Sequence, residues 1–404
     1  MGRKTNAFLH KCAIFAKKIL PECVGDPVIE FLKRKKQQLE ETVLKNKSVR
    51  PQYSPLWEQK NANVEFRIAY FNGCPDGRSE RYRINNIVDE FTRCNIIADV
   101  YSYGSLKKLS SWPLYDLLIL FRCANCDQPE MQEILKKYKA GNIAILYDTD
   151  DYLLDRTTEH DRKKVIDTIN WCDGITVTTE YLANLYRHAL NKKCWVIRNS
   201  INPKQYKLAQ QLEPSQKRKT VNICYLCGTN THDEDFSCAE KALYEVLSAH
   251  SEARLYLIGP LSKGRLIESV RGQIVRKKYM PYLQLQRLTA KMDINIAPLV
   301  VDDFNQSKSE IKIFEAALVG VPTIASPIQP YKNLITSGKN GYIASTHDEW
   351  KKQLETLISS PELRSKMGEQ ARRDFVETYR VENVAKTAIQ IYRELIDYQK
   401  DWTD

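Results

Sequence analysis

Short hydrophobic runs alternate with amphipathic stretches along most of this chain from residue 64 onward. Such runs are typical of strands that are buried on both faces of a parallel sheet. In the first half they lie at 67–71, 116–120, 143–147, 175–177 and 195–197. Patterns with the period of a helix separate them near 82–93, 128–139, 161–171 and 180–190. This alternation predicts a doubly wound α/β sheet with helices on both faces.

The alternation of strand and helix patterns stops at residues 202–220, where Pro203, Pro214 and several Gln and Lys favour a linker. It then restarts, with strand-like runs at 221–226, 255–258, 294–297 and 323–325 and a helical tail from about residue 361. A chain of 404 residues is long enough for two such domains. Because ligands of open α/β sheets bind beyond the carboxyl ends of the strands, two facing domains predict a cleft between them.

The eleven cysteines are scattered, and no secretory signal precedes them, so we expect a reducing, cytoplasmic environment. Two pairs have CxxC spacing, Cys123 with Cys126 and Cys224 with Cys227. A zinc site is the alternative to small buried thiols, but no further ligands stand at useful spacing. No apolar run reaches the roughly 18 residues that span a bilayer, so the protein is expected to be soluble or peripheral to a membrane.

The net charge of +11 is concentrated at the N-terminus, where residues 1–50 hold twelve Lys and Arg against five Asp and Glu. A hydrophobic stripe in this region consists of Phe8, Cys12, Phe15 and Ile19, flanked by Lys11 and Lys18. The pattern predicts a basic amphipathic helix within a helical extension over residues 1–60. An anionic membrane surface is one partner for it, and packing on the main body or on a second subunit is the alternative. Nucleic acid is not expected, because no reader motif accompanies the charge.

The most informative segment is NQSKSEIKIFEAALVGVP, from residue 305 to residue 322. Ser307 followed by Glu310 matches a capping box, and the closing Gly-Val-Pro is a stop signal. The segment therefore predicts a helix over residues 308–319.

On this helix Lys308, Lys312 and Glu315 are expected to share one face, because they stand at i, i+4 and i+7. A helix N-terminus offers unpaired amides and a positive dipole end, and two lysines beside it predict a diphosphate pocket. Glu315 lies deeper, where it is expected to accept hydrogen bonds from a ribose diol. The alternative is a solvated helix face with a Lys312–Glu315 ion pair.

A glycine loop follows the first strand of the second half. Gly228 and Thr229 stand at the strand exit, and His232 and Asp235 precede a helix expected over 237–250. Glycine at a strand exit allows backbone amides to approach a phosphate. The loop therefore predicts a phosphate contact near Gly228 and Thr229, with helix capping by Asp235 and a surface position for His232 as the alternative.

Acidic side chains cluster at a strand exit in the first half, where Asp148, Asp150 and Asp151 follow a hydrophobic run. We expect Asp150 or Asp151 to orient or deprotonate an acceptor hydroxyl as the catalytic carboxylate. A D-x-D metal site and a phospho-acceptor pocket are weaker alternatives, and no divalent metal or other cofactor is expected. Capping of the following segment is an alternative for Asp148.

Two arginines follow the first predicted strand, in the sequence Ser-Glu-Arg-Tyr-Arg that ends at Arg83. Arg81 and Arg83 at a helix start suit an anionic ligand, such as a phosphate-linked acceptor. Solvation at the surface is the alternative.

The run from residue 305 to residue 326, N-x-x-K-S-x-x-K-x-x-E followed by G-x-P-T-I-A-S, resembles the donor-site helix of retaining glycosyltransferase family 4 and related enzymes of the GT-B fold. In the order of the predicted strands and helices, the resemblance spans about residues 64–385. It implies that Asn305 and Ser309 belong to the donor site, together with Lys308 and Lys312. It also implies that the donor diphosphate lies against the turn at Gly228 and Thr229, with His232 and Asp235 close to it.

The same resemblance makes Glu315 the second glutamate of the family's E-x7-E motif, which binds the nucleotide ribose. The first glutamate falls at Ser307, so the chain departs from the family where the transferred sugar is held. Lys308 and Ser309 are expected to take over part of that function, as in polysaccharide-assembly branches with the N-x-x-K-S form.

The resemblance implies a glycosyltransferase, of hexosyl or deoxyhexosyl type, that moves a sugar from a nucleoside diphosphate sugar to a hydroxyl of a glycan or lipid-linked acceptor. The alternatives are an epimerase-like enzyme of the same fold and a non-catalytic subunit that binds nucleotide sugars. The implied domains are an extension (1–60), an acceptor domain (61–201), a linker (202–220), a donor domain (221–380) and a helix that crosses back to the first domain (381–404).

Overall fold

The protein is described here from a computed structural model that covers most of the chain. The described residues are 64–74, 79–102, 114–124, 126–155, 157–212, 219–228, 233–261 and 266–400. The predicted basic extension over residues 1–60 lies outside them, as do Thr229 and His232.

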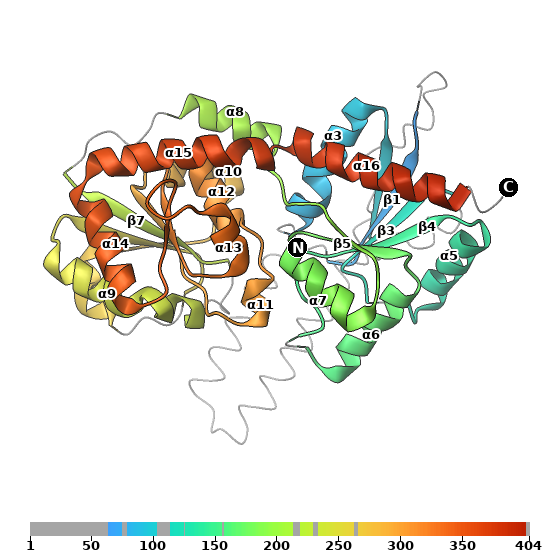
Figure 1. Cartoon of the computed structure of the whole chain (residues 1–404), viewed down its shortest axis with the longest axis horizontal. Coiled ribbons are helices and arrows are strands. Elements are labelled where there is room, and N and C mark those ends of the chain that lie inside the picture. The colour runs from blue at the N-terminus through green and yellow to red at the C-terminus, as the bar shows by residue number, and fades with distance from the viewer. Residues whose placement is uncertain are drawn as a thin grey trace, which may run out of the picture.

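Two lobes, each built on a six-stranded parallel sheet, lie side by side and are bridged by long helices (Figure 1). The first sheet has the order β2-β1-β3-β4-β5-β6. Its strands are β1 (Arg67–Asn72), β2 (Ile97–Ser102), β3 (Leu117–Phe121), β4 (Ala144–Asp148), β5 (Gly174–Val177) and β6 (Cys194–Val196). Its helices are η2 (Arg81–Asn85), α3 (Asn86–Phe91), η3 (Thr92–Cys94), α5 (Pro129–Ala140), α6 (Glu159–Asn170) and α7 (Glu180–Leu190).

The second sheet has the order β12-β11-β10-β7-β8-β9. Its strands are β7 (Val221–Leu226), β8 (Ala253–Ile258), β9 (Ile274–Lys277), β10 (Ile294–Ala297), β11 (Thr323–Ala325) and β12 (Tyr342–Ile343). The helices of this lobe are α9 (Asp233–Ala249), η6 (Ile267–Gln273), α10 (Tyr282–Thr289), α11 (Asp303–Gln306), α12 (Ile311–Leu318), α13 (Gln329–Leu334), α14 (His347–Ser359) and α15 (Pro361–Tyr379).

Each sheet is covered on both faces, which confirms the predicted α/β class with two doubly wound lobes. All the paired strands of both sheets are parallel, and the strands β1, β3 and β4 are almost entirely buried. Strands of this kind must be apolar on both faces, which explains why continuous hydrophobic runs marked them in the sequence.

Three strands were missed by the hydrophobic pattern. In β2, Asp99 interrupts the run, and its charge is accommodated because the hydroxyl of Tyr115 donates to its carboxylate at 2.6 Å. The edge strand β9 is partly exposed, and β12 has only two residues. The residues of β9 and β12 are partly exposed, so these two strands lack the continuous apolar signal of a buried strand.

The segment predicted as a linker contains a helix, α8 (Pro203–Gln211). Asn202 caps it by accepting from the backbone of Gln205, and the Gln205 side chain accepts from the backbone of Asn202, which completes a capping box. Proline at the first position of a helix is favourable, so Pro203 begins this helix rather than breaking a structure.

The C-terminal helix α16 (Val381–Lys400) runs along the first lobe, whereas α15 before it runs along the second (Figure 1). The buried face of α16 includes Val384, Ala388 and Tyr392, in one apolar cluster with Phe91 and strands of the first sheet. Phe91 and Tyr392 meet edge to face at 6.1 Å between ring centroids. This helix therefore completes the core of the first lobe from the far end of the sequence.

The backbone segments that follow β7 and β8 lie very close together in the second lobe. Gly259, directly after β8, has a φ of +108°, and a Cβ there would lie 1.9 Å from the carbonyl oxygen of Cys227. A side chain is therefore excluded at this position. The contact brings the ends of β7 and β8 together directly beside Gly228.

Candidate functional site

The donor segment forms two short helices instead of the single helix predicted over 308–319. Asp302 caps α11 by accepting from the backbone of Asn305 at 2.8 Å, and the Ser307 hydroxyl donates to the carbonyl of Phe304. Glu310 is the N-cap residue of α12 but makes no side-chain capping bond. The predicted capping box therefore does not form, because Ser307 closes the preceding turn.

Lys308 and Ser309 consequently lie in the connection between α11 and α12, ahead of the helix that carries Lys312 and Glu315. The expectation that Lys308, Lys312 and Glu315 share one helix face is wrong in this respect. The connection nevertheless brings Lys308 toward the first lobe, where its ammonium meets Asp151 at 2.7 Å.

Lys312 is the least satisfied cation of this segment. Its Nζ atom is shielded from solvent, and no hydrogen-bond acceptor among the described residues reaches it. The ammonium lies 5.0 Å from the centroid of the Tyr225 ring. Burial lowers the pKa of Lys312 to about 8, and the nearby charge of Lys308 lowers it too, whereas Asp235 opposes the shift. A buried ammonium without a partner costs free energy that an incoming anion would recover.

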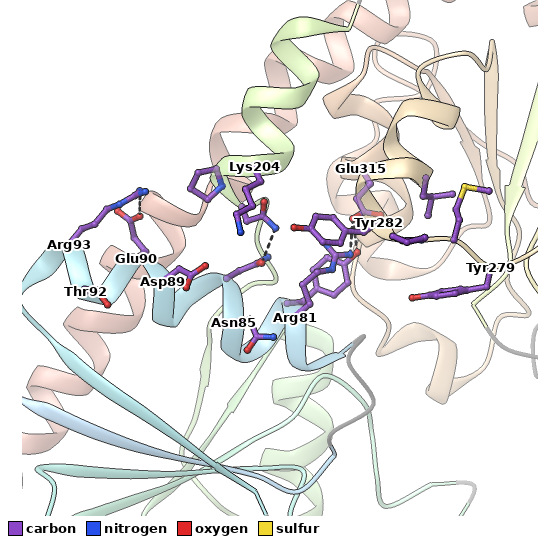
Figure 2. A pocket seen from close by; sticks show the side chains of 17 residues that line it. Arg81, Asn85, Asp89, Glu90, Thr92, Arg93, Lys204, Tyr279, Tyr282 and Glu315 are labelled. Carbon is purple, nitrogen blue, oxygen red and sulfur yellow. Dashed lines mark hydrogen bonds and ion pairs between the residues drawn. The ribbon is translucent and has the colours of Figure 1, made fainter. Parts of the chain in front are cut away.

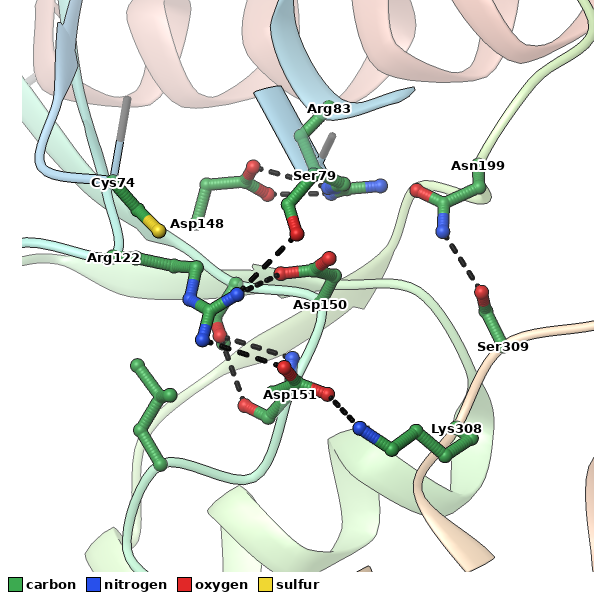
Figure 3. Close-up of polar contacts among 12 residues, drawn as sticks. Cys74, Ser79, Arg83, Arg122, Asp148, Asp150, Asp151, Asn199, Lys308 and Ser309 are labelled. Atoms are coloured by element: carbon green, nitrogen blue, oxygen red, sulfur yellow. Dashed lines mark hydrogen bonds and ion pairs between the residues drawn. The ribbon is translucent and has the colours of Figure 1, made fainter. Parts of the chain in front are cut away.

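The acidic cluster of the first lobe contacts Lys308 of the second lobe through Asp151 (Figure 3). Arg122 contacts Asp150 at 3.3 Å and Asp151 at 3.3 Å, and Asp151 also receives the ammonium of Lys308. Burial and the charge of Asp151 raise the pKa of Asp150, and Arg122 lowers it. Arg122 has a left-handed φ of 49°, a strained conformation that is found preferentially at functional sites.

Asp148 and Arg83 form a buried pair within the first lobe. Arg83 donates to both carboxylate oxygens of Asp148 and to the carbonyl of Ile197, and Thr176 also donates to Asp148. Both side chains are almost fully shielded from solvent. The prediction that Arg83 binds an anionic ligand is therefore wrong, because its guanidinium is already used to join the lobe's own strands.

A second set of contacts joins the lobes at the start of α12. The Asn199 amide donates to the Ser309 hydroxyl at 2.8 Å (Figure 3), and Arg198 donates to Glu310 at 3.1 Å. Burial raises the pKa of Glu310, while Arg198 opposes the shift. These bonds hold the connection that carries Lys308 and Ser309 against the end of the first sheet.

Glu315 is held by residues of the first lobe and of α8. Its Oε1 atom accepts from the Tyr82 hydroxyl at 2.6 Å, from Gln205 at 2.9 Å and from Arg81 at 3.2 Å. The Arg81 guanidinium lies between two aromatic rings, 3.8 Å from the centroid of Tyr82 and 4.3 Å from that of Tyr282. Arg81 therefore meets the donor helix, away from the acidic cluster where a phosphate-linked acceptor was expected.

A cavity of about 900 Å³ opens beside this carboxylate, between the two lobes (Figure 2). From the second lobe it is lined by Tyr279, Tyr282 and Glu315, and from the other side by Arg81 and Lys204. Its size suits a nucleoside or a larger ligand, since ligand pockets typically measure about 300–1,000 Å³.

The remaining donor residues lie at the exit of the second sheet. Asp235 is buried in the first turn of α9 and accepts from the Asn305 amide at 2.9 Å and from the backbone of Val300 at 3.0 Å. Asn305 also donates to the carbonyl of Val300. These two side chains thus fasten α11 and α9 to the end of β10, and Gly228 is the second residue after β7.

Within the described ranges, no group of three or more His, Cys, Asp and Glu side chains is placed to hold a metal ion. The cysteines of the CxxC pairs Cys123–Cys126 and Cys224–Cys227 are buried and form no disulfide among the described residues. No helix among the described residues is long and apolar enough to cross a membrane.

Several site residues were not found by sequence reasoning, namely Tyr82, Arg122, Arg198, Asn199, Gln205, Tyr282 and Glu310. Two of them carried a usable signal. Arg122 directly follows the apolar strand β3, and strand exits are where ligands bind in open α/β sheets. Gln205 stands three residues after Asn202, which is the spacing of a capping box.

Comparison with known proteins gives a consistent result. Residues 239–390 match the family model described as glycosyl transferase-like, which covers α12 and most of the second lobe. A search of curated protein sequences finds no match.

Solved structures resemble the whole fold. HepE from Anabaena, crystallised with UDP and glucose, is 13% identical, with a TM-score of 0.61 over 81% of this chain and 100% of HepE. Sucrose-phosphate synthase from Thermosynechococcus elongatus is 12% identical, with a TM-score of 0.60 over 82% of this chain and 99% of that enzyme. TarM from S. aureus is 14% identical, with a TM-score of 0.52 over 68% of this chain, which spans only 55% of TarM. The chain thus has the GT-B fold of glycosyltransferases, and its second lobe contains a glycosyl transferase-like domain.

Proposed function

We propose that this protein transfers a sugar from a nucleoside diphosphate sugar to a hydroxyl group of a glycan or lipid-linked acceptor. One observation carries the proposal: Lys312 holds a shielded ammonium that no acceptor among the described residues reaches, and Glu315 lines a cavity one turn further along α12. A cation and a carboxylate in this order match the diphosphate and the ribose of a nucleotide.

In this proposal the diphosphate binds between Lys308 and Lys312. The ammonium of Lys308 interacts electrostatically with that of Lys312 and lowers its pKa, so an anion between them would relieve their repulsion. Two lysines and the amides at the start of α12 would stabilise the charge that develops on the leaving diphosphate. We therefore propose transfer without a bound divalent metal.

The acceptor would bind at the acidic cluster of the first lobe. Burial and Asp151 raise the pKa of Asp150, which makes its carboxylate a better proton acceptor near neutral pH. Arg122 bridges Asp150 and Asp151, so it would hold both carboxylates at the exit of the sheet.

The transferred sugar would be held by Lys308 and Ser309 rather than by residue 307. The Ser307 side chain is fully buried, and its hydroxyl donates to the carbonyl of Phe304. It therefore stabilises the turn after α11, and a glutamate in its place would have to leave this turn to reach a sugar.

The basic sequence of residues 1–50 supports a further part of the proposal, a contact with the anionic cytoplasmic face of a membrane. Such a surface would bring the protein to a lipid-linked acceptor. Flotation of the full chain with vesicles of phosphatidylcholine, with and without phosphatidylglycerol, tests this contact.

A binding screen tests the proposed function. Uridine, guanosine and thymidine diphosphate sugars are titrated into the wild type, Glu315→Ala and Glu315→Gln. We expect one nucleotide class to bind the wild type and to lose about 30-fold or more with Glu315→Ala, because a charged hydrogen bond to ribose contributes about 2 kcal/mol. Glu369→Ala, on the exposed surface of α15, is the matched control.

Four results would overturn the proposal or one of its parts. Absence of binding by every nucleotide sugar would reject the donor site. Turnover of the nucleotide sugar into an isomer without any acceptor would favour the epimerase alternative, and binding without turnover across an acceptor panel would favour a non-catalytic subunit. Loss of activity with a chelator would reject metal-independent transfer.

A further inference from the structure

The contacts of Glu315 are unevenly shared between its two oxygens. Tyr82, Gln205 and Arg81 all donate to Oε1, at distances from 2.6 to 3.2 Å. No donor among the described residues reaches Oε2. The Glu315 side chain is 16% exposed, and the residue lines the cavity between the lobes. One oxygen is thus committed to the protein, and the other keeps its accepting capacity.

The three donors come from elements outside the donor lobe's own sheet. Tyr82 and Arg81 belong to η2, a π-helical turn at the start of the first lobe's first helix. Wide turns of this kind are frequent at functional sites because they redirect side chains. Here two neighbouring residues reach the same carboxylate, and the Arg81 guanidinium lies over the Tyr82 ring.

Each donor is itself fixed in place. The Arg81 guanidinium is stacked between Tyr82 and Tyr282 and also donates to Gln205 at 3.0 Å. Gln205 is tied into the capping box of α8, and its carbonyl accepts from Gln286 at 2.7 Å. Burial, followed by the charge of Glu315, raises the pKa of Tyr82 well above its usual value, so its hydroxyl stays protonated and donates throughout the physiological range.

We propose that Tyr82, Arg81 and Gln205 are positioning residues for the nucleotide donor: they fix Glu315 so that its Oε2 atom meets the ribose hydroxyls. This inference rests on the proposed function and adds the first lobe to a site otherwise built from the second. A carboxylate fixed before binding loses less conformational entropy when the ligand arrives, which raises affinity.

The same contacts link donor binding to the arrangement of the lobes. Glu315 reaches Tyr82 and Arg81 only while the first lobe lies against α12, so nucleotide binding and lobe contact stabilise each other. The opposite effect, in which Arg81 and Tyr82 compete with the ribose for Glu315, would require the ligand to displace them from Oε1. The two cases differ in sign, because removing a positioning group weakens binding and removing a competitor strengthens it.

The variant Tyr82→Phe separates these cases. It keeps the ring that stacks on Arg81 and removes only the hydroxyl that donates to Glu315. Calorimetric titrations use uridine diphosphate and guanosine diphosphate, each beside its 2′,3′-dideoxy counterpart. We expect the affinity for the preferred ribonucleotide to fall about 10-fold, the equivalent of about 1.4 kcal/mol, because the carboxylate loses one of the donors that fix it. The affinity for the dideoxy counterpart is expected to stay within about twofold, because that ligand never uses Glu315.

Tyr206→Phe is the matched control, because Tyr206 lies on α8 and its ring faces Arg380 rather than the cavity. A second variant, Arg81→Lys, keeps the positive charge. It loses the planar guanidinium, which stacks on two tyrosine rings and donates to both Gln205 and Glu315. It is expected to lower ribonucleotide affinity while again sparing the dideoxy ligand. Melting temperatures of both variants show whether they remain folded.

The outcomes are distinguishable from those of the function test. If the wild type binds neither diphosphate nor any nucleotide sugar, the proposed function itself fails. If the wild type prefers ribose and Tyr82→Phe keeps that preference in full, the positioning of Glu315 is wrong. Tighter ribonucleotide binding by Tyr82→Phe or by Arg81→Lys would show competition instead and would equally overturn the inference. A parallel loss for the ribo and dideoxy ligands would assign Tyr82 to general stability of the fold.

Discussion

Lys312 and Glu315 stand three residues apart on the same short helix, yet their surroundings are opposite. Lys312 has a shielded ammonium without an acceptor among the described residues, and burial lowers its pKa to about 8. Glu315 has one oxygen that accepts three hydrogen bonds. In the proposed donor site the two residues would therefore act differently. The cation lacks partners and would receive an anion, and the carboxylate is fixed in advance and would accept from neutral hydroxyls.

The largest effect on nucleotide affinity is expected from the variant Lys312→Met, which keeps an apolar side chain of similar length and removes the charge. Removing an ammonium that faces the diphosphate should lower nucleotide affinity about 30-fold, the equivalent of about 2 kcal/mol. The empty protein should become more stable, with a melting temperature higher by a few degrees, because a buried charge without a partner costs free energy. Calorimetry and thermal unfolding measure the two effects.

Lys332→Met, on an exposed position of α13, is the control and should change neither quantity. A lower melting temperature in Lys312→Met would show that the ammonium already has a stabilising partner, which would remove the contrast with Glu315.

A smaller effect is expected from pH. The pKa of Lys312 in the free protein is about 8, so the ammonium form dominates below that pH and the neutral amine above it. Only the ammonium form attracts a diphosphate, so affinity should be nearly constant below pH 7.5 and fall about 10-fold between pH 7.5 and 9.5. Lys312→Arg should flatten this dependence because a guanidinium stays charged. An equally steep profile in Lys312→Arg would assign the titration to another group.

The smallest effect concerns Lys308, whose ammonium is engaged by Asp151 at 2.7 Å. In the variant Asp151→Asn this competitor loses its charge, so nucleotide affinity should rise about threefold, consistent with a partly exposed ion pair. Asp348→Asn, at an exposed position of α14, serves as the control. Weaker nucleotide binding by Asp151→Asn would mean that the carboxylate orients Lys308 toward the ligand instead of competing for it. Turnover is measured separately, since Asp151 belongs to the proposed acceptor site.

Much of the fold could be predicted because buried parallel strands need apolar residues on both faces. The strands β7, β10 and β11 have the predicted limits, and only β2, β9 and β12 escaped the pattern. The predicted ends of helices were less accurate where one residue could cap either of two turns. Ser307 bonds to Phe304 within its own turn, so the helix that the sequence predicted from residue 308 begins at Ile311.

The candidate site was predictable only in part. Lys312 and Glu315 were identified because their spacing on one helix is a local property. Arg83 was assigned to a ligand, but it forms a pair with Asp148, 65 positions away. Tyr82 and Gln205 went unnoticed because they become relevant only when they meet Glu315, which is 233 and 110 positions away from them.

The sequence by itself determined the two α/β lobes, the strand exits where ligands bind and the charged residues of the donor helix, because periodicity and spacing act over a few residues. Tertiary structure alone decided which charged side chains form ion pairs within the protein and which remain accessible to a ligand. That outcome depends on groups far apart in the chain meeting at distances of about 3 Å, where burial fixes the cost of each missing partner. The proposed donor site therefore depends on the way the two lobes meet, and the lysine and glutamate of α12 acquire their opposite surroundings only there.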